Sequence, residues 1–120
     1  MDRIRFVDHR GTQLLHIDFS GLDARAVEKL VGEAKAFIAT QAPGSLRTVT
    51  DVSNARFDDP AVASFKEYVR HNGPYVRSAA VVGVTGLKKI LLNAVKLFSK
   101  RDFALFDGCE PAKDWLASRE

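Results

Sequence analysis

Apolar and polar residues alternate in the first part of the chain, a pattern typical of half-buried β-strands. We expect strands over residues 4–8 and over residues 12–19, and a His-Arg-Gly tripeptide at 9–11 separates the two runs. A short break that contains glycine favours a tight hairpin, because glycine adopts positive φ without strain. In the second run every other residue from Leu15 to Phe19 is apolar, so we expect one face of this strand to be buried.

Amphipathic stretches that predict helices follow these strands. Ser20 and Asp23 have the spacing of a capping box, and apolar residues recur at helical spacing after them. A second helix is expected to begin at Asp59-Pro60, because aspartate is a good cap and proline suits the first helical position. The Asn-Gly-Pro sequence at 72–74 ends it. The apolar stripe of the first helix consists of Val27, Leu30, Val31, Ala34 and Ile38.

The clearest amphipathic pattern in the chain opens at Thr85-Gly86 and predicts a third helix. A short closing helix is expected over residues 111–118, packed through Trp115 and Leu116. The apolar stripe of the third helix consists of Leu87, Ile90, Leu91, Ala94, Val95 and Phe98.

Three further apolar runs, at 46–52, 79–84 and 103–106, complete the pattern as strands. The valine-rich run at 79–84 suits a central, buried strand. The order ββαβαβαβα predicts an α/β fold with a mostly parallel sheet, one antiparallel edge strand and helices on both faces. We expect residues 1–120 to form a single domain.

Two stretches of the sequence resemble a known family. Val49-Thr50-Asp51-Val52-Ser53, followed by a short loop and a helix, is similar to the central strand of STAS-like domains. The segments 71–76 (HNGPYV) and 80–89 (AVVGVTGLKK) resemble an uncharacterised bacterial branch of SpoIIAA-like proteins. The resemblance covers nearly the whole chain. Its most specific part is the second stretch, which consists of the segments 71–76 and 80–89.

This resemblance implies the fold of anti-sigma-factor antagonists and of the cytosolic domains of sulfate transporters. Such proteins act by protein contact, often under control of phosphorylation, and some relatives bind nucleotides or lipids; the resemblance does not imply catalysis. The antagonists carry a phosphorylatable serine at the start of the helix after this strand. Here Asp58-Asp59-Pro60 occupies the corresponding stretch, and Asp59 stands in place of the serine. We interpret Asp59 as a helix cap rather than as a mimic of phosphate.

Composition limits the remaining choices. No stretch approaches the roughly 18 consecutive apolar residues of a membrane span, and the charged start of the chain is unlike a signal peptide, so we expect a cytoplasmic protein. Cys109 is the only cysteine among 120 residues, which excludes an internal disulfide and a cluster of thiolate ligands. The net charge of +3 is too small to argue for nucleic acid as a partner.

Polar residues at the carboxyl ends of the strands are the candidate ligand site, because ligands of open α/β sheets bind there. An anion would be held by free backbone N–H groups at the start of the third helix and attracted by the lysines behind it. An ordinary threonine cap beside a closely packed glycine explains the same pattern and is the favoured interpretation. The candidate site comprises Asp51, Ser53, Asn54, Arg56, Thr85, Gly86, Lys88 and Lys89.

A second hypothesis comes from the distribution of charge. Residues 68–101 contain seven basic and no acidic side chains. This basic face would dock an acidic protein, a phosphate-bearing ligand or an anionic membrane surface. A solvated face whose lysines pair with neighbouring acids is an equal alternative. A homodimer that forms through Leu92 or Leu97 is a further alternative. The predicted partner face consists of Lys88, Leu92, Lys96 and Lys100.

The sequence offers few candidate catalytic residues. A triad of Ser53, His71 and Asp51 can be written down, but no spacing supports it. No paired spacing of metal ligands is present, and Asp58 beside Asp59 is more typical of a helix start than of a cation site. Cys109 lies near the start of the last helix, where a thiol pKa falls, but no base is evident beside it. We therefore expect no catalytic residue, no metal and no cofactor.

Together these patterns predict a non-enzymatic, cytosolic regulatory or binding module of STAS-like type that acts through protein contacts. The alternative is a carrier or sensor of a small anionic or amphipathic ligand, such as a nucleotide, a phosphate-bearing molecule or a lipid. A contact module should lack a sizeable cavity, whereas a carrier should have an apolar pocket with a few polar groups. An enzyme should have clustered titratable groups with shifted pKa values.

Overall fold

Among the described residues, five strands form one sheet in which the spatial order is also the chain order, β1-β2-β3-β4-β5. A computed structural model describes residues 3–85 and 102–119. β1 and β2 pair antiparallel, and the other neighbouring pairs are parallel, as the sequence predicts. The strands are β1 (Ile4–His9), β2 (Thr12–Asp18), β3 (Leu46–Asp51), β4 (Val76–Val82) and β5 (Asp102–Phe106).

The hairpin between β1 and β2 closes as predicted. Arg10 has φ 54° and Gly11 has φ 81°, so both central residues adopt the left-handed conformation. Two such residues make a type I′ turn, whose twist matches that of the flanking strands. The turn sets the register in which His9 pairs with Thr12 and Ile4 with Ile17.

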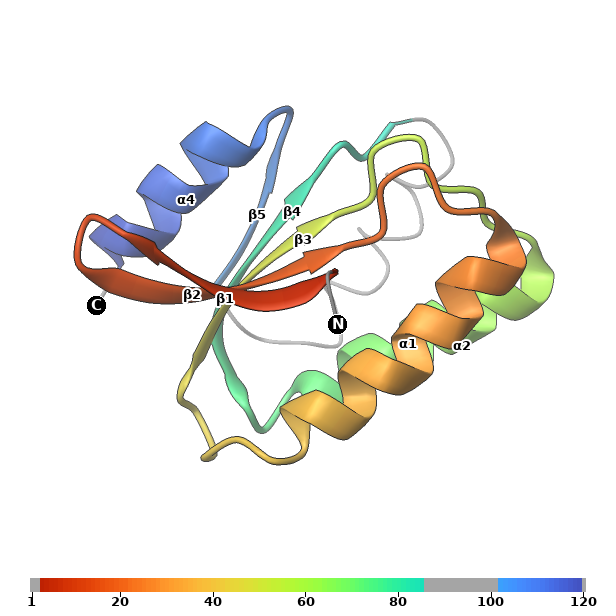
Figure 1. The fold of residues 1–120 in the computed structure, drawn as a ribbon, viewed down its shortest axis with the longest axis horizontal. Coiled ribbons are helices and arrows are strands. Elements are labelled where there is room, and N and C mark those ends of the chain that lie inside the picture. Colours follow the sequence, from red (N-terminus) through yellow and green to blue (C-terminus); the bar gives the residue numbers. More distant parts are fainter. Residues whose placement is uncertain (1–2, 86–101, 120) are drawn as a thin grey trace.

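Helices cover both faces of the sheet (Figure 1). α1 (Ala24–Ile38) and α2 (Asp59–Asn72) lie side by side on one face, and α4 (Cys109–Ser118) lies on the other. All five apolar residues predicted for the stripe of α1 are buried, and so are Phe65 of α2 and Leu116 of α4. The predicted third helix lies outside the described residues except for Thr85, which is exposed and belongs to neither helix nor strand.

The caps predicted for α1 and α2 are both wrong. The N-cap of α1 is Asp23, whose carboxylate accepts a hydrogen bond from the backbone N–H of Ala26, and Ser20 takes no part in the cap. The N-cap of α2 is Asp58, which accepts from the backbone N–H of Ala61, while Asp59 lies within the first turn. In each case the cap is the last residue with extended backbone, from which a carboxylate reaches an N–H three residues on.

Strand β2 is buried on both faces, which corrects the expectation of one buried face. Leu15 and Ile17 face α1 and α2, whereas Leu14 belongs to a second core under α4. His16 alternates with the apolar residues Leu15 and Ile17, a pattern that predicts an exposed side chain, but it is only 7% exposed. The reason is α4, which folds back over the face that the alternation of β2 marks as polar.

Several boundaries also differ from the predicted ones. β4 begins at Val76 and ends at Val82, so it is shifted towards the amino end of the predicted run, although it is central and buried as expected. Gly83, with φ 83°, ends it. α4 begins at Cys109 rather than at Pro111. Among the described residues, no helix is both long enough and apolar enough to cross a membrane.

Candidate functional site

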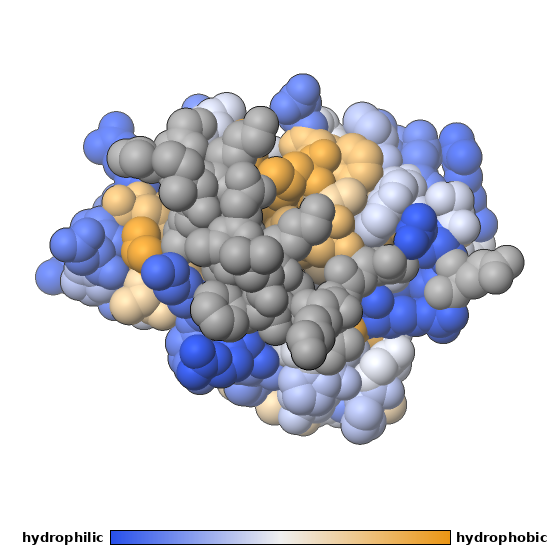
Figure 2. All heavy atoms as spheres, turned by 180° about the vertical axis from the view of Figure 1, so that it is seen from behind, coloured by the Kyte–Doolittle hydropathy of each residue, from blue (hydrophilic) through white to orange (hydrophobic). Residues whose placement is uncertain are grey.

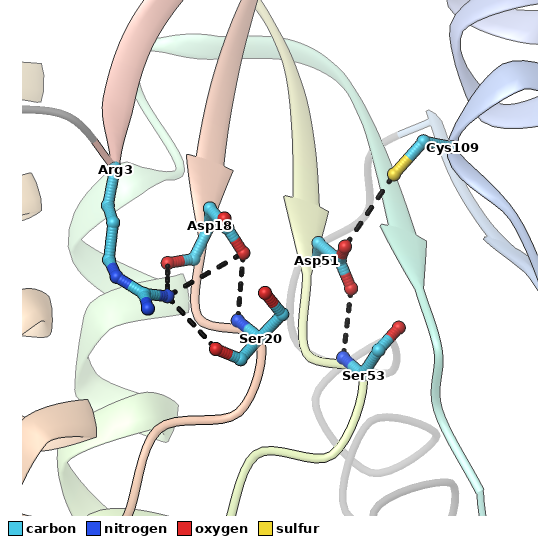
Figure 3. Close-up of polar contacts among 6 residues, drawn as sticks. All are labelled: Arg3, Asp18, Ser20, Asp51, Ser53 and Cys109. Atoms are coloured by element: carbon cyan, nitrogen blue, oxygen red, sulfur yellow. Dashed lines mark hydrogen bonds and ion pairs between the residues drawn. The ribbon is translucent and has the colours of Figure 1, made fainter.

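Strands β2 and β3 end with the same local structure. Asp18 accepts a hydrogen bond of 2.9 Å from the backbone N–H of Ser20, and Asp51 accepts one of 2.9 Å from that of Ser53 (Figure 3). An aspartate that bonds to the backbone two residues on stabilises the turn that it begins. Asp51 and Ser53, two predicted site residues, therefore have a structural role at the end of β3.

Backbone hydrogen bonds join the loops that follow these strands. The N–H of Gly21 donates to the carbonyl of Ser53 at 2.9 Å, and the N–H of Arg56 donates to that of Leu22 at 2.8 Å. The loop after β4 packs against them, because Gly83 lies directly on Ser53. We call residues 19–23, 52–58 and 83–85 the loop platform. These bonds and contacts tie the backbones of the three loops together.

The loop platform, with the end of β3 beneath it, contains every described residue of the predicted ligand site. Asn54, with φ 59°, and Arg56 are exposed, as is Thr85, whereas Asp51 and Ser53 are half-buried. The remaining predicted residues lie outside the described part of the chain, and so does the whole predicted partner face. They are Gly86, Lys88 and Lys89 of the site, and Lys88, Leu92, Lys96 and Lys100 of the face.

The helix starts on the loop platform are already capped by acids. Asp23 and Asp58 cap α1 and α2, and Asp59 adds a carboxylate to the first turn of α2. These negative charges compensate the positive ends of the helix dipoles, so neither helix start offers an anion site. Arg56 is an exposed cation in the loop that leads to α2.

Arg3 holds the end of β2 in place. Its Nη1 donates to the carbonyl oxygens of Asp18 and Ser20, each at 3.0 Å, and lies 3.8 Å from Oδ1 of Asp18. Burial by itself would raise the pKa of Asp18, but the hydrogen bonds from Ser20 and the charge of Arg3 outweigh burial and lower it. Asp18 is thus held as a carboxylate.

A second polar cluster, which sequence reasoning missed, lies between β2, β3 and the start of α4. One ring nitrogen of His16, one carboxylate oxygen of Asp51 and Sγ of Cys109 all lie within 4.8 Å of one another. The thiol donates to Oδ2 of Asp51 at 3.6 Å, so the expectation that no base lies beside Cys109 is wrong. We call these three residues the His-Asp-Cys cluster.

The pKa values of Cys109 and His16 are shifted in the directions opposite to those of a catalytic cysteine–histidine pair. Burial, reinforced by the negative charge of Asp51, raises the pKa of Cys109, contrary to the fall expected at a helix start. Burial, together with the charges of Arg5 and Lys113, lowers the pKa of His16. An activated cysteine needs the opposite, a thiolate beside an imidazolium.

The triad of Ser53, His71 and Asp51 does not assemble. Oδ1 of Asp51 accepts from the backbone of Ser53 rather than from a histidine. His71 lies in the last turn of α2, where its ring stacks on Tyr75 at a centroid distance of 5.9 Å. This end of α2 is opposite to the one at the loop platform (Figure 1).

A small hollow separates α2 from strands β3, β4 and β5. The volume that the centre of a water molecule can reach in it is about 50 Å³. Seen from behind, the molecule has apolar areas among hydrophilic side chains (Figure 2). The described residues that line the hollow are mainly apolar: Thr48, Thr50, Phe65, Tyr68, Val69, Asn72, Gly73, Val76, Ala79, Val81 and Phe103.

Comparison with known proteins identifies the fold. No family model and no curated protein matches the chain. The crystal structure of an uncharacterised protein of the DUF3478 family from Shewanella loihica PV-4, described as having a SpoIIAA-like fold, superposes with a TM-score of 0.73. The match covers 94% of this chain and 91% of the other at 16% sequence identity. The protein therefore has a SpoIIAA-like fold, as the resemblance in its sequence implied.

Proposed function

We propose that this protein is a non-enzymatic binding module of STAS type that acts through protein contacts, with the loop platform as its contact surface. The observation that supports this proposal is the hydrogen bonding between the loops after β2 and β3. A surface that is ordered before binding loses little conformational entropy when a partner docks. Arg56 and Asn54 project from this ordered backbone, and arginine is enriched among residues that dominate binding energy.

The size of this hollow, as the described residues outline it, favours a contact module over a carrier that binds at this place. Pockets that enclose small organic ligands have volumes of about 300–1,000 Å³. The hollow beside α2 offers about 50 Å³, which is room for very few water molecules. A nucleotide or a lipid would need α2 to move away from the sheet.

The protonation states favour binding over catalysis. Titratable groups with shifted pKa values do cluster at His16 and Cys109, which is the feature expected of an enzyme. The direction of the shifts, however, keeps the thiol protonated and the imidazole neutral. Such a pair lacks the thiolate that a cysteine nucleophile requires.

Carriage of a small amphipathic molecule is the second candidate. The hollow has the apolar wall and the few polar side chains, among them Thr50 and Asn72, that such a ligand needs. This function would apply if a ligand widened the space between α2 and β4.

A charge reversal on the loop platform tests the first proposal. We expect Arg56→Glu to weaken binding of a purified partner at least about 30-fold, since removal of a dominant interface residue costs about 2 kcal/mol or more. Arg70→Glu is the matched control, because Arg70 is exposed at the other end of α2. The partner is first captured with the wild-type protein, and its Kd is then measured for all three proteins by calorimetry.

Equal affinities of the wild-type protein and the Arg56→Glu variant would contradict the assignment of the surface. A wild-type protein that captures no protein but retains a stoichiometric organic molecule would favour the carrier instead.

A further inference from the structure

The three residues of the His-Asp-Cys cluster come from three elements that the fold brings together. His16 pairs with Val49 and Asp18 pairs with Asp51, so the side chains of His16 and Asp51 are diagonal neighbours on adjacent parallel strands. Both residues share the sheet face that α4 covers, since Val49 belongs to the core under that helix. The first residue of α4, Cys109, completes the group.

His16 has no partner for its polar atoms among the described residues. The residue is only 7% exposed, and neither ring nitrogen makes a hydrogen bond. A buried polar group without a hydrogen bond costs roughly 1–3 kcal/mol, so proteins rarely leave one unless it serves another purpose. One of these nitrogens lies within 4.8 Å of both the Asp51 carboxylate and the Cys109 sulfur.

The carboxylate of Asp51 is held in the orientation of a ligand. Its Oδ1 accepts from the backbone N–H of Ser53 at 2.9 Å, which turns Oδ2 towards the sulfur of Cys109 at 3.6 Å. A carboxylate oxygen and a thiolate sulfur bound to one tetrahedral zinc ion are about 3.5 Å apart, given their usual bond lengths to zinc. The observed separation is therefore already that of two ligands, and a ring nitrogen of His16 lies within 4.8 Å of the sulfur and of a carboxylate oxygen of Asp51.

The charges of the cluster balance those of a divalent ion. Asp51 supplies one negative charge, Cys109 supplies a second when its proton leaves to solvent, and neutral His16 supplies a lone pair. The complex with a divalent cation has no net charge, which suits a half-buried position. Imidazole, carboxylate and thiolate together are ligands typical of zinc.

We propose that His16, Asp51 and Cys109 form a binding site for a divalent ion of the zinc class, with the fourth position open to water or to a donor atom of a binding partner. The reaction is an exchange of one thiol proton for the ion, and no oxidation state changes. The site is separate from the contact surface on the loop platform and does not depend on the function proposed for it.

A second group, His9, Glu110 and Asp114, provides the control. Nε2 of His9 lies 2.7 Å from Oδ1 of Asp114, and Nη2 of Arg10 lies 3.4 Å from the same oxygen. These contacts already engage the His9 ring and the Asp114 carboxylate, and the group contains no sulfur. Substitution of His9 therefore separates binding on the surface from binding at Cys109.

The experiment uses the full chain, stripped of metal by a chelator and titrated with Zn²⁺ or Co²⁺. We expect one ion per chain by native mass spectrometry and, with Co²⁺, the charge-transfer absorption of a cobalt–thiolate bond. Cys109→Ser should abolish this absorption, and His16→Leu should weaken Zn²⁺ affinity by more than about 10-fold, the loss that even an outer-sphere change causes. Asp51→Asn should also weaken binding, although its amide oxygen can still accept from Ser53. His9→Gln should bind as the wild-type protein does.

Circular dichroism of each variant without metal establishes that the chain is folded, so that a loss of binding is not a loss of structure. Two results would overturn the proposal. One is the absence of cobalt–thiolate absorption in the folded wild-type protein. The other is loss of Zn²⁺ binding in His9→Gln with normal binding in Cys109→Ser, which would place the ion on the surface group.

Discussion

Gly83 determines how closely the loops after β3 and β4 pack. Its φ of 83° lies in the left-handed region, which residues with a Cβ rarely adopt. A Cβ at this position would lie 2.0 Å from Oγ of Ser53 and 2.7 Å from its Cα. The second contact involves backbone, so a rotamer change of Ser53 cannot relieve it. The loop platform therefore requires a glycine here.

Substitution of Gly83 should destabilise the protein more than substitution of a glycine with similar φ in open space. For Gly83→Ala we expect a loss of about 2–4 kcal/mol in the free energy of unfolding, from positive-φ strain and overpacking together. Gly44 has φ 67°, and a Cβ added there would meet no atom within 4 Å, so Gly44→Ala should cost about 1 kcal/mol. Urea denaturation measures both values, and equal losses would contradict the close packing on Ser53.

Single residues also mark the limit of prediction from sequence. Asp51 and Ser53 were predicted at the end of a strand and lie there, because the strand pattern locates its own end. The partners of Asp51 could not be predicted, since His16 and Cys109 are far away in the sequence and meet only through strand register and the path of α4. An alternation of apolar and polar residues places His16 on a solvent face and gives no sign of the helix that covers it.

At the scale of elements, the start of α2 shows which of two adjacent aspartates caps the helix. Asp58 has extended backbone and accepts from the N–H of Ala61 at 2.9 Å, whereas Asp59 is exposed in the first turn. A side-chain cap is worth about 1 kcal/mol, and a carboxylate near the dipole is worth about 0.3–1 kcal/mol.

We therefore expect Asp58→Ala to lower the free energy of unfolding by about 1 kcal/mol and Asp59→Ala to lower it by less. Thermal unfolding of the two variants beside the wild-type protein makes the comparison. A larger loss for Asp59→Ala would mean that the helix begins one residue later than described.

The elements themselves were mostly predictable, and their ends were less so. Hydrophobic periodicity identified the stripe of α1, and the His-Arg-Gly tripeptide identified the β1–β2 turn, because both signals are local. The caps of α1 and α2 were misassigned because several serine and aspartate residues within a few positions suit the same role, and backbone dihedrals decide among them.

At the scale of the whole molecule, the helices place the two candidate sites at different positions on the sheet. α1 and α2 cover one face of the sheet and begin at the loop platform, and α4 covers the other face and begins at the His-Asp-Cys cluster (Figure 1, Figure 3). Asp51 lies between the two, because its Oδ1 orders the turn below the platform and its Oδ2 faces Cys109.

The order of the described strands also differs from that of a doubly wound sheet. In doubly wound sheets a ligand-binding crevice forms where the strand order reverses. Here the described strands follow one another without reversal, and the two described helices that connect parallel strands lie on the same face. The described strands therefore lack the reversal at which doubly wound sheets bind their ligands.

Native mass spectrometry of the protein isolated from its own cells tests the central claim most directly. The account predicts a complex with another protein, present for the wild-type chain and for Arg70→Glu and absent for Arg56→Glu. A monomer that carries a stoichiometric organic molecule, or a protein complex equally abundant in all three samples, would contradict it.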